Sequence, residues 1–314
     1  MNRYFLALAL SLYGVVCFAQ DRREVDETKD ADPNGTVTIE IVRGEVQVRG
    51  WNRDQVRVSG RLDERMEEFV FEVRDDETEI EVKLPRHLNG WQSGSSDLQI
   101  SVPENSSLQV NGVSTDVEVV DIKGGVRAHS VSGEVDVANV AKRIDLSSVS
   151  GSVNLRDVDG RIRARTVSGD IDGRDVIGHG NYDSVSGSIT LVTSGEVLDV
   201  ESVSGSIELT LQDINEVTGN TVSGDIEISG DLQKGGNIDL ESISGTVELV
   251  LDTDTDARFD IETGSGGRIR NRLTNDQPKV SKYSRDSMLR FVMGDGSGEV
   301  VISTASGRVV LDSR

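Results

Sequence analysis

A short phrase repeated at a fixed interval constrains the fold of this chain more than any other feature of its sequence. Ser-Val-Ser-Gly or a related phrase recurs every 18 residues through the centre of the chain, and later at steps of 19 and 21 residues. The copies begin at Gly112, Ser130, Ser148, Thr166, Ser184, Ser202, Thr221, Ser242 and Thr263, with a last copy at Thr304. Self-similarity at so short a period indicates stacked structural units, each resting on its neighbours.

Aliphatic residues recur at fixed places within each repeat and alternate with polar residues from Thr36 onward, which is the pattern of β-strands. A first column is Val113, Val131, Val149, Val167, Val185, Val203, Val222 and Ile243. A second column is Val117, Val135, Val153, Ile171, Ile189, Ile207, Ile226 and Val247. A third column is Val119, Val137, Leu155, Gly173, Leu191, Leu209, Ile228 and Leu249. Pairs such as Ile144 and Leu146 follow on the far side of each repeat. We expect all of these columns to point inward.

The repeated phrase itself has an architectural interpretation. We expect its valine to pack inward and its glycine, such as Gly151, to let the backbone bend or adopt a positive φ at a corner. Serines such as Ser132 and Ser150 are placed to hydrogen-bond the corner backbone or one another. The sequence therefore predicts an all-β, single-domain parallel β-solenoid (β-helix) with about 18 residues per coil. Its N-terminal coils are expected to be irregular, and an excursion is expected near the C-terminus.

The start of the chain resembles a secretory signal peptide. A basic residue, Arg3, precedes a nearly unbroken apolar run from Tyr4 to Phe18, and Ala19 suits the last position before cleavage. A membrane anchor is the alternative, but the run is short for a bilayer. We predict a signal peptide at 1–19, a flexible acidic lead-in at 20–35 and the repeat domain at 36–314. The expected location is the periplasm or the cell surface of a bacterium. The single cysteine, Cys17, leaves with the signal, so no disulfide is expected in the mature chain.

Composition limits the partners that the protein can have. The net charge of −22 repels the phosphates of nucleic acids, so no nucleic-acid partner is expected. No later apolar run is long enough for a transmembrane span in the mature chain. No cofactor motif is found, and the expected partner is an envelope protein, a glycan or a lipid headgroup.

Three stretches of the chain resemble a known family. They are the recurring phrase, the segment "GEVQVRGWNRDQVRV" (Gly44–Val58) and the segment "GDGSGEVVISTASGRVVL" (Gly294–Leu311). Together they resemble the bacterial "putative adhesin" β-strand-repeat domain family of unknown function. The resemblance covers nearly all of residues 36–314. It implies a right-handed, exported β-solenoid and supplies no catalytic residues.

A column of acidic residues lies beside the second aliphatic column. It comprises Glu118, Asp136, Asp172, Glu208, Glu227 and Glu248, interrupted by Asn154 and Thr190. In stacked coils these side chains would recur every ~4.8 Å, and like charges directly opposed across strands are destabilising. One interpretation is a solvated face that prevents aggregation, and the other is a surface that collects divalent cations or a basic partner.

A basic segment interrupts the repeat near the C-terminus. It contains Arg268, Arg270, Arg272, Lys279, Lys282, Tyr283, Arg285 and Arg290. It either neutralises an acidic face of its own chain or binds an anionic envelope ligand through arginine side chains. A second excursion, Arg86–Asp97, carries Trp91 in a Gly/Ser-rich loop and is a further binding candidate.

No catalytic constellation is evident. The histidines, His87, His129 and His179, are scattered and lack metal-ligand spacing, and no metal site with histidine ligands is predicted. We therefore expect a non-catalytic envelope protein with a binding, adhesion-like or scaffolding role. The alternative is a polysaccharide-cleaving β-helix enzyme, which would need two carboxylates ~5–10 Å apart beside aromatic side chains that stack on sugars.

Overall fold

The computed structural model describes residues 23–85 and 94–314, and within these ranges it consists of strands without a helix. The prediction of an all-β chain is confirmed. The first six strands are β1 (Glu24–Asp30), β2 (Thr36–Trp51), β3 (Gln55–Arg61), β4 (Glu68–Arg74), β5 (Glu77–Lys83) and β6 (Ser96–Pro103). No helix in the described ranges could therefore cross a membrane. The predicted signal peptide and Trp91 lie outside the described residues.

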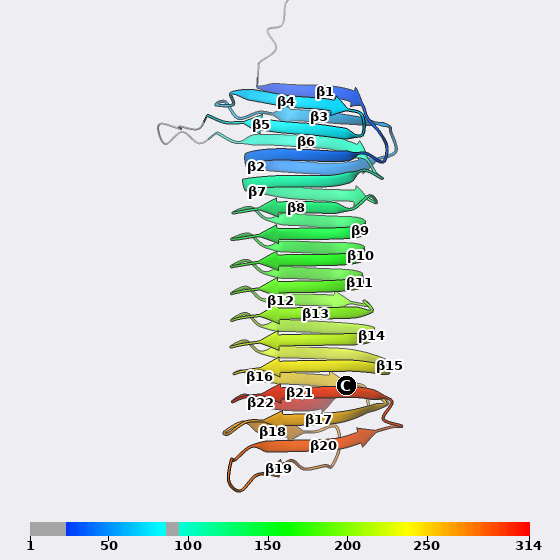
Figure 1. The fold of residues 1–314 in the computed structure, drawn as a ribbon, viewed down its shortest axis with the longest axis vertical. Helices are drawn as coiled ribbons and strands as arrows, with labels where there is room; N and C mark the ends of the chain where they lie inside the picture. The colour runs from blue at the N-terminus through cyan, green and yellow to red at the C-terminus, as the bar shows by residue number, and fades with distance from the viewer. Residues whose placement is uncertain (1–22, 86–93) are drawn as a thin grey trace, which may run out of the picture.

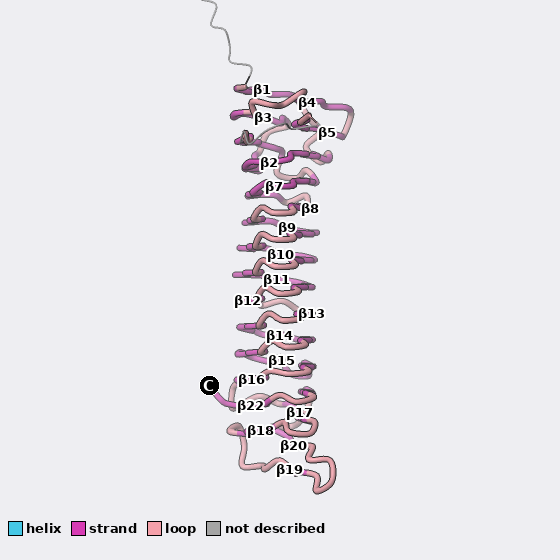
Figure 2. Tube along the Cα trace, turned by 90° about the vertical axis from the view of Figure 1, so that its left-hand side faces the viewer, coloured by secondary structure: helices cyan, strands magenta, loops and turns pink. Residues whose placement is uncertain are grey.

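The centre of the molecule is a column of similar coils, one above another (Figures 1 and 2). Its strands are β7 (Ser107–Ile122), β8 (Val126–Ser130), β9 (Val135–Ser148), β10 (Val153–Thr166), β11 (Ile171–Ser184), β12 (Ile189–Thr193), β13 (Val197–Ser202), β14 (Ile207–Thr221), β15 (Ile226–Ser242) and β16 (Thr246–Leu251). Neighbouring strands are parallel and in register with the repeat, so Val153 pairs with Val135 on one side and Ile171 on the other. Each coil is therefore one copy of the repeat.

The second and third aliphatic columns fill the interior of this stack, as predicted. Val135, Val153 and Ile171 are fully buried, and so are Leu155 and Leu191 of the third column. Stacking β-branched and leucine side chains directly above one another gives a thin core that needs few aromatic rings.

The interior adapts where the third column carries glycine. A Cβ on Gly173 would overlap the side chain of Leu191, which occupies the vacant space. A Cβ on Gly180 would overlap the ring of Tyr182 in the same way. Tyr182 is completely buried, so its ring replaces the aliphatic side chain that the neighbouring coils supply at the position of Gly180.

The repeated phrase forms the turn between the two halves of a coil. In one coil the Ser148 hydroxyl donates to the carbonyl of Gly133 in the preceding coil (2.9 Å), and accepts from the N–H of Gly151 (2.9 Å). Ser148 is 3 % exposed, so the first residue of the phrase, a serine or threonine, points inward. Its hydroxyl satisfies backbone groups that the turn would otherwise leave buried without partners.

The glycine of the phrase is required for a further reason besides the predicted bend or positive φ. Gly245 has a φ of 133°, as predicted, whereas Gly151, Gly169 and Gly187 do not have positive φ. A Cβ on Gly187 would instead overlap the carbonyl oxygen of Gly169, the glycine of the coil before it. The turns therefore stack so closely that only a hydrogen fits between consecutive backbones.

The opposite corner of the coil uses residues that tolerate the left-handed conformation. Asp121, Asn139, Asp157 and Asp175 are one repeat apart and have φ between 51° and 65°. Asp and Asn adopt this conformation more readily than other non-glycine residues. The Asn139 amide also donates to the Asp121 carboxylate of the preceding coil (2.6 Å), so the corner contributes to stacking.

The N-terminal end is irregular and contains antiparallel strands. β1 pairs with β3, β3 with β6, and β4 with β5, all antiparallel. The predicted flexible lead-in at 20–35 is therefore wrong for Glu24–Asp30, which forms β1. Val25 is buried there and Arg57 binds Asp26 through two hydrogen bonds of 2.8 and 3.0 Å. This segment carries no periodic hydrophobic signal, because the edge strand buries a single apolar side chain.

At the C-terminus the coils do not stack in sequence order. The strands are β17 (Ala257–Thr263), β18 (Arg268–Asn271), β19 (Lys279–Val280), β20 (Ser287–Met293), β21 (Gly298–Thr304) and β22 (Arg308–Ser313). β21 lies between β15 and β17, and β22 lies between β16 and β18, with parallel pairing on both sides. The last coil of the chain is thus inserted beneath the regular stack, and β20 and β19 follow beyond β17 (Figure 1). The predicted excursion is confirmed as an end covering, whereas the insertion was not predicted.

Candidate functional site

The first aliphatic column is exposed, which contradicts the prediction that it packs inward. Val113 is 48 % exposed, Val222 is 41 % exposed and Ile243 is 56 % exposed, with the five valines between them in the same range. The reason lies in the turn, where a serine or threonine precedes every member of the column except Val113 and takes the inward position. In the turn of Val149 the Ser148 hydroxyl forms two hydrogen bonds with backbone groups there. We call the eight residues of this column the valine ladder: Val113, Val131, Val149, Val167, Val185, Val203, Val222 and Ile243.

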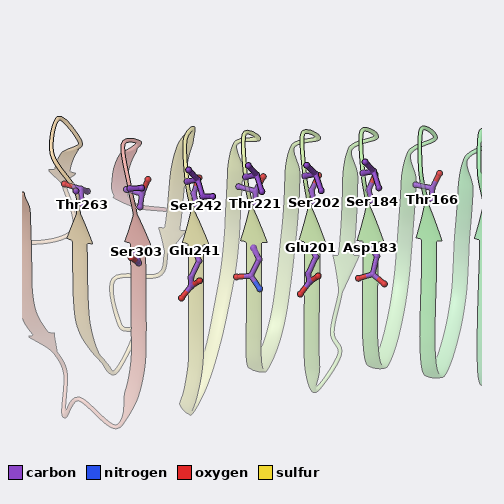
Figure 3. A pocket seen from close by; sticks show the side chains of 18 of the residues that line it. Thr166, Asp183, Ser184, Glu201, Ser202, Thr221, Glu241, Ser242, Thr263 and Ser303 are labelled. Carbon is purple, nitrogen blue, oxygen red and sulfur yellow. The ribbon is translucent and has the colours of Figure 1, made fainter.

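A long groove runs beside most of the valine ladder and has a volume of about 1330 Å³. It extends from Ser147 in β9 to Met288 in β20, across several successive coils. Contiguous exposed apolar surface of this kind marks an interaction site more often than scattered single residues do. Figure 3 shows the groove from close by, with the turns at the ends of parallel strands and a row of polar side chains beneath them.

Three parallel rows line the groove. The ladder forms one, and the buried hydroxyl residues of the turns, Thr166, Ser184, Ser202, Thr221, Ser242 and Thr263, form the second. The third row is charged and lies on the strands just before the turns. In spatial order it reads Ser147, Arg165, Asp183, Glu201, Asn220, Glu241, Ser303 and Glu262, since each is the register partner of the next.

The charged row contains four acids and one arginine, and no ion pair with another described residue is formed by Asp183, Glu201 or Glu241. Asp183 lies beside Glu201 in the register, with Asp199 on the same strand as Glu201. Burial raises the pKa of Asp183, and the neighbouring charges of Glu201 and Asp199 raise it further. Arg165 lies on the other side but is already within 3.5 Å of Asp145. This stretch of the groove therefore favours a cationic partner.

At its C-terminal end the groove meets the segment that the sequence marked as basic. Asp286, Ser287 and Met288 line this end. Arg290 hydrogen-bonds Asp260 (2.9 Å) and Glu262 (3.0 Å), which holds β20 against β17 and raises the pKa of its own guanidinium. For Arg290 the predicted self-neutralising role is therefore the one that the contacts support.

The remaining basic residues divide into two groups. Arg268, Arg270 and Arg272 lie with Arg308 around a hollow of about 540 Å³ on the other sheet face. Arg272 binds Asp312 (2.5 Å), while no ion pair is formed by Arg268 or Arg270 within the described ranges. Arg308 was missed at the sequence level because the insertion of β22 beside β18 is what makes it the register partner of Arg268. Lys279 lies in β19, and Lys282, Tyr283 and Arg285 lie in the turn that joins β19 to β20.

The predicted acidic column is in register but lies away from the groove. Glu118 pairs with Asp136, Asp172 with Thr190, and Glu208, Glu227 and Glu248 follow in succession. The Asn154 amide donates to both Asp136 (2.7 Å) and Glu134 (2.5 Å), which relieves part of the repulsion. In the part of the chain that the structure describes, no three His, Cys, Asp or Glu side chains are grouped to hold a metal ion.

One serine does contact a histidine. The His129 Nδ1 lies 2.6 Å from the Ser147 hydroxyl, and burial lowers the pKa of His129, which favours its neutral form. In a hydrolytic triad a carboxylate orients the histidine through its other nitrogen. Among the described residues no hydrogen bond joins a carboxylate to His129, so the pair lacks that arrangement. His179 instead lies 3.2 Å from Glu196 and is exposed.

Comparison with known proteins gives the family of the chain. No curated protein matches it. A matching solved structure, described as that of a "putative cell adhesion protein" from Clostridium sporogenes ATCC 15579, is 13 % identical, with 93 % of this chain and 100 % of that chain covered and a TM-score of 0.27. The sequence profile described as Toastrack DUF4097 matches residues 23–216, from the N-terminal end into β14, and the predicted family resemblance is confirmed. Since this match covers more than half of the 314 residues, the chain belongs to the Toastrack DUF4097 family.

Proposed function

We propose that this protein is an exported, non-catalytic β-solenoid that holds an extended partner along its groove. The observation that carries the proposal is the valine ladder, eight aliphatic side chains that are all more than 40 % exposed, six of which line a groove of about 1330 Å³. Leaving these side chains in water forgoes the stabilisation that burial would provide, about 25 cal/mol per Å² of apolar surface. A partner that covers the ladder recovers that free energy.

The geometry of the groove defines the kind of partner that fits. Its three rows repeat at the spacing of parallel strands, ~4.8 Å, so the ladder is about 34 Å long from Val113 to Ile243. A compact small molecule would fill only a fraction of that length. An extended chain with apolar groups toward the ladder and cations toward Asp183 and Glu201 would match two rows along much of it.

The chemistry of the lining supports binding over polysaccharide cleavage. Glycoside hydrolysis requires two carboxylates, and sugar-binding clefts use aromatic side chains as stacking surfaces. Asp183 and Glu201 supply neighbouring carboxylates, but the residues lining the groove include no aromatic side chain. The groove therefore has acids without a surface on which to hold a sugar ring.

Export is proposed on the sequence of residues 1–19. The basic residue, the apolar run and Ala19 favour cleavage near Ala19-Gln20. Mass spectrometry of the protein from its native cells should find a mature chain that begins near Gln20 or Asp21. A chain that retains Met1 in the cytoplasmic fraction would refute export.

Photo-crosslinking in intact cells tests the binding function. A photo-reactive amino acid at Val203 should give a discrete crosslinked product, and the same group at Glu208, exposed on the other sheet face, should not. Val185→Asp in the Val203-labelled chain should weaken the product, because it places a charge on the ladder. Equal labelling at both positions, or no product from Val203, would refute a binding role for the groove.

A further inference from the structure

The hairpin between β19 and β20 projects a basic and apolar tip into solvent. Tyr283 is 100 % exposed and Val280 is 63 % exposed. Lys279, Lys282 and Arg285 are also exposed, and none forms an ion pair with another described residue. The tip is nevertheless ordered by β-pairing, with Lys279 opposite Met288 and a hydrogen bond from the Ser281 N–H to the Asp286 carbonyl (2.9 Å).

This tip has the properties that the groove requires of a partner. It offers two apolar side chains and three cations, offset by the single carboxylate of Asp286. The groove offers the valine ladder and the neighbouring carboxylates of Asp183 and Glu201. Each surface leaves apolar side chains exposed to water, and the charges of the two surfaces are opposite.

The tip cannot reach this stretch of its own groove. From Asp183 the charged row runs through Glu201, Asn220, Glu241, Ser303 and Glu262 to Met288, which is six strand spacings. At ~4.8 Å per spacing, Met288 lies about 29 Å from Asp183, and the tip lies beyond Met288. The β-pairing of Lys279 and Val280 fixes the tip at the end of the stack. A contact between tip and acidic groove must therefore come from another molecule.

We infer that the groove binds a second copy of this chain, with the hairpin tip of each copy placed against Asp183 and Glu201 of the other. The inference rests on the proposed function, since it names the partner of the same groove. The tip and the turns that carry the ladder project from the same edge of the stack (Figure 1). An antiparallel arrangement about a two-fold axis therefore places the tip of each copy against the groove of the other copy. The resulting interface is closed and self-complementary.

The contact would be large enough for a stable dimer. The overlap from Asp183 to the tip covers about seven strand spacings, or ~34 Å. The strip from the charged row across the turn is about six residues wide, or ~20 Å. Their product, ~700 Å² on each copy, is close to the ~800 Å² per partner of a standard specific interface.

The oligomeric state of the mature chain and of matched variants tests the inference. By light scattering and sedimentation, the unaltered chain should be a dimer that weakens as salt rises, because salt screens the charges of the rim. A tip variant (Lys279→Glu, Lys282→Glu, Arg285→Glu) and a groove variant (Asp183→Lys, Glu201→Lys) should each be monomeric. An equal mixture of the two should dimerise again, because each reversed surface then meets an opposite one. The control Arg268→Gln, Arg270→Gln should remain dimeric.

A direct contact is tested by disulfide formation, since the mature chain contains no cysteine. A mixture of Tyr283→Cys and Val185→Cys chains should crosslink under mild oxidation, whereas Tyr283→Cys with Glu208→Cys should not. Thermal unfolding checks that each variant is folded. If a tip or groove variant is not folded, the milder changes Tyr283→Ser in the tip and Glu201→Gln in the groove replace it. A monomeric unaltered chain, or a dimer that survives both charge reversals, would overturn the inference. If the chain is monomeric while Val203 still crosslinks a different protein in cells, the binding function stands and only self-association fails.

Discussion

Replacing Tyr182 by phenylalanine should make the protein more stable. The Tyr182 ring fills the space beside Gly180, but its hydroxyl is buried and has no hydrogen-bond partner. A buried polar group without a partner costs about 1–3 kcal/mol. Tyr182→Phe keeps the ring and removes the cost, so the free energy of unfolding should rise by about that amount. The melting temperature of a chain this long should rise by roughly 2 °C per kcal/mol.

The Tyr182 hydroxyl also predicts that the difference in stability between Tyr182→Phe and the unaltered chain grows at high pH. Burial raises the pKa of Tyr182 above its ordinary value of 10.0. The hydroxyl then ionises in the unfolded chain at lower pH than in the folded one. Below about pH 10 the hydroxyl is neutral in both states and the free energy of unfolding does not depend on its ionisation. Above about pH 10 the free energy of unfolding falls by about 1.4 kcal/mol per pH unit until the pKa of the folded state is reached. Tyr182→Phe lacks this loss, so its advantage should widen above pH 10.

Urea unfolding followed by far-ultraviolet circular dichroism, at pH 7 and at two values above pH 10, would measure both effects. Tyr283→Phe is the matched control, because the Tyr283 side chain is fully exposed and its hydroxyl is solvated. That control should change stability by less than about 0.5 kcal/mol. A Tyr182→Phe protein less stable than the unaltered one would mean that the hydroxyl has a partner, and the reasoning would be refuted.

Three further changes test the turn and the C-terminal end. Val185→Asp should leave thermal stability nearly unchanged because Val185 is exposed, whereas Ile189→Asp should lower it by several kcal/mol because Ile189 is buried; equal effects would refute the assignment of the ladder. Gly187→Ala should destabilise the stack strongly, since a Cβ there overlaps a backbone carbonyl, and an unchanged melting temperature would contradict the close stacking of turns. Arg272→Gln should reduce stability only at low salt and above about pH 4, because Arg272 lowers the pKa of Asp312 and that carboxylate must be ionised for the pair to stabilise the fold; an effect that persists in high salt would point to packing instead.

The interior of the stack could be predicted because parallel strands in register place identical positions above one another. A column such as Val135, Val153 and Ile171 then reports one environment, so the repeated residue type identifies it. The same argument placed the predicted acidic column on a common face, as its register partners confirm. The environment of a position can be inferred from its column in this way wherever one coil follows the next without interruption.

The valine ladder was assigned to the wrong side because hydrophobicity alone decided the prediction. Alternation along the strand continues into the turn: Ile144, Leu146 and Ser148 are buried, so Val149 falls on the outward side. The hydrogen bonds of Ser148 to the Gly133 carbonyl and the Gly151 N–H outweigh the apolar character of valine. The available signal was the serine or threonine at the first position of nearly every phrase, a small hydroxyl residue that caps backbone groups. The groove exists because the valines face solvent, so it was not predicted either.

The position of the last coil could not be predicted from spacing. The interval from Thr263 to Thr304 indicated an interruption, but spacing along the chain does not say between which coils the returning segment pairs. The structure inserts β21 and β22 between the coil that ends at Leu251 and the coil that begins at Ala257. That insertion brings Arg308 to Arg268 and places β19 and β20 beyond the stack, so the candidate binding tip depends on it.

Out-of-order coils at both ends have a common consequence for the stability of the stack. In a plain stack the terminal coil has one neighbour, so it can open alone and fraying proceeds inward coil by coil. Here β2 pairs with β7 on one side and with β5 and β6 on the other, although β7 follows them all in the chain. β21 is likewise enclosed between β15 and β17. β2 and the coil of β21 and β22 therefore lie in interior layers and cannot leave before the outer strands have separated, although β1 remains an edge strand. Apart from β1, the outer strands are held by loops whose ends are fixed in the stack, so opening them gains less conformational entropy than releasing a free end. This arrangement keeps the hairpin tip and the groove at a constant separation, which a docking surface about 34 Å long requires.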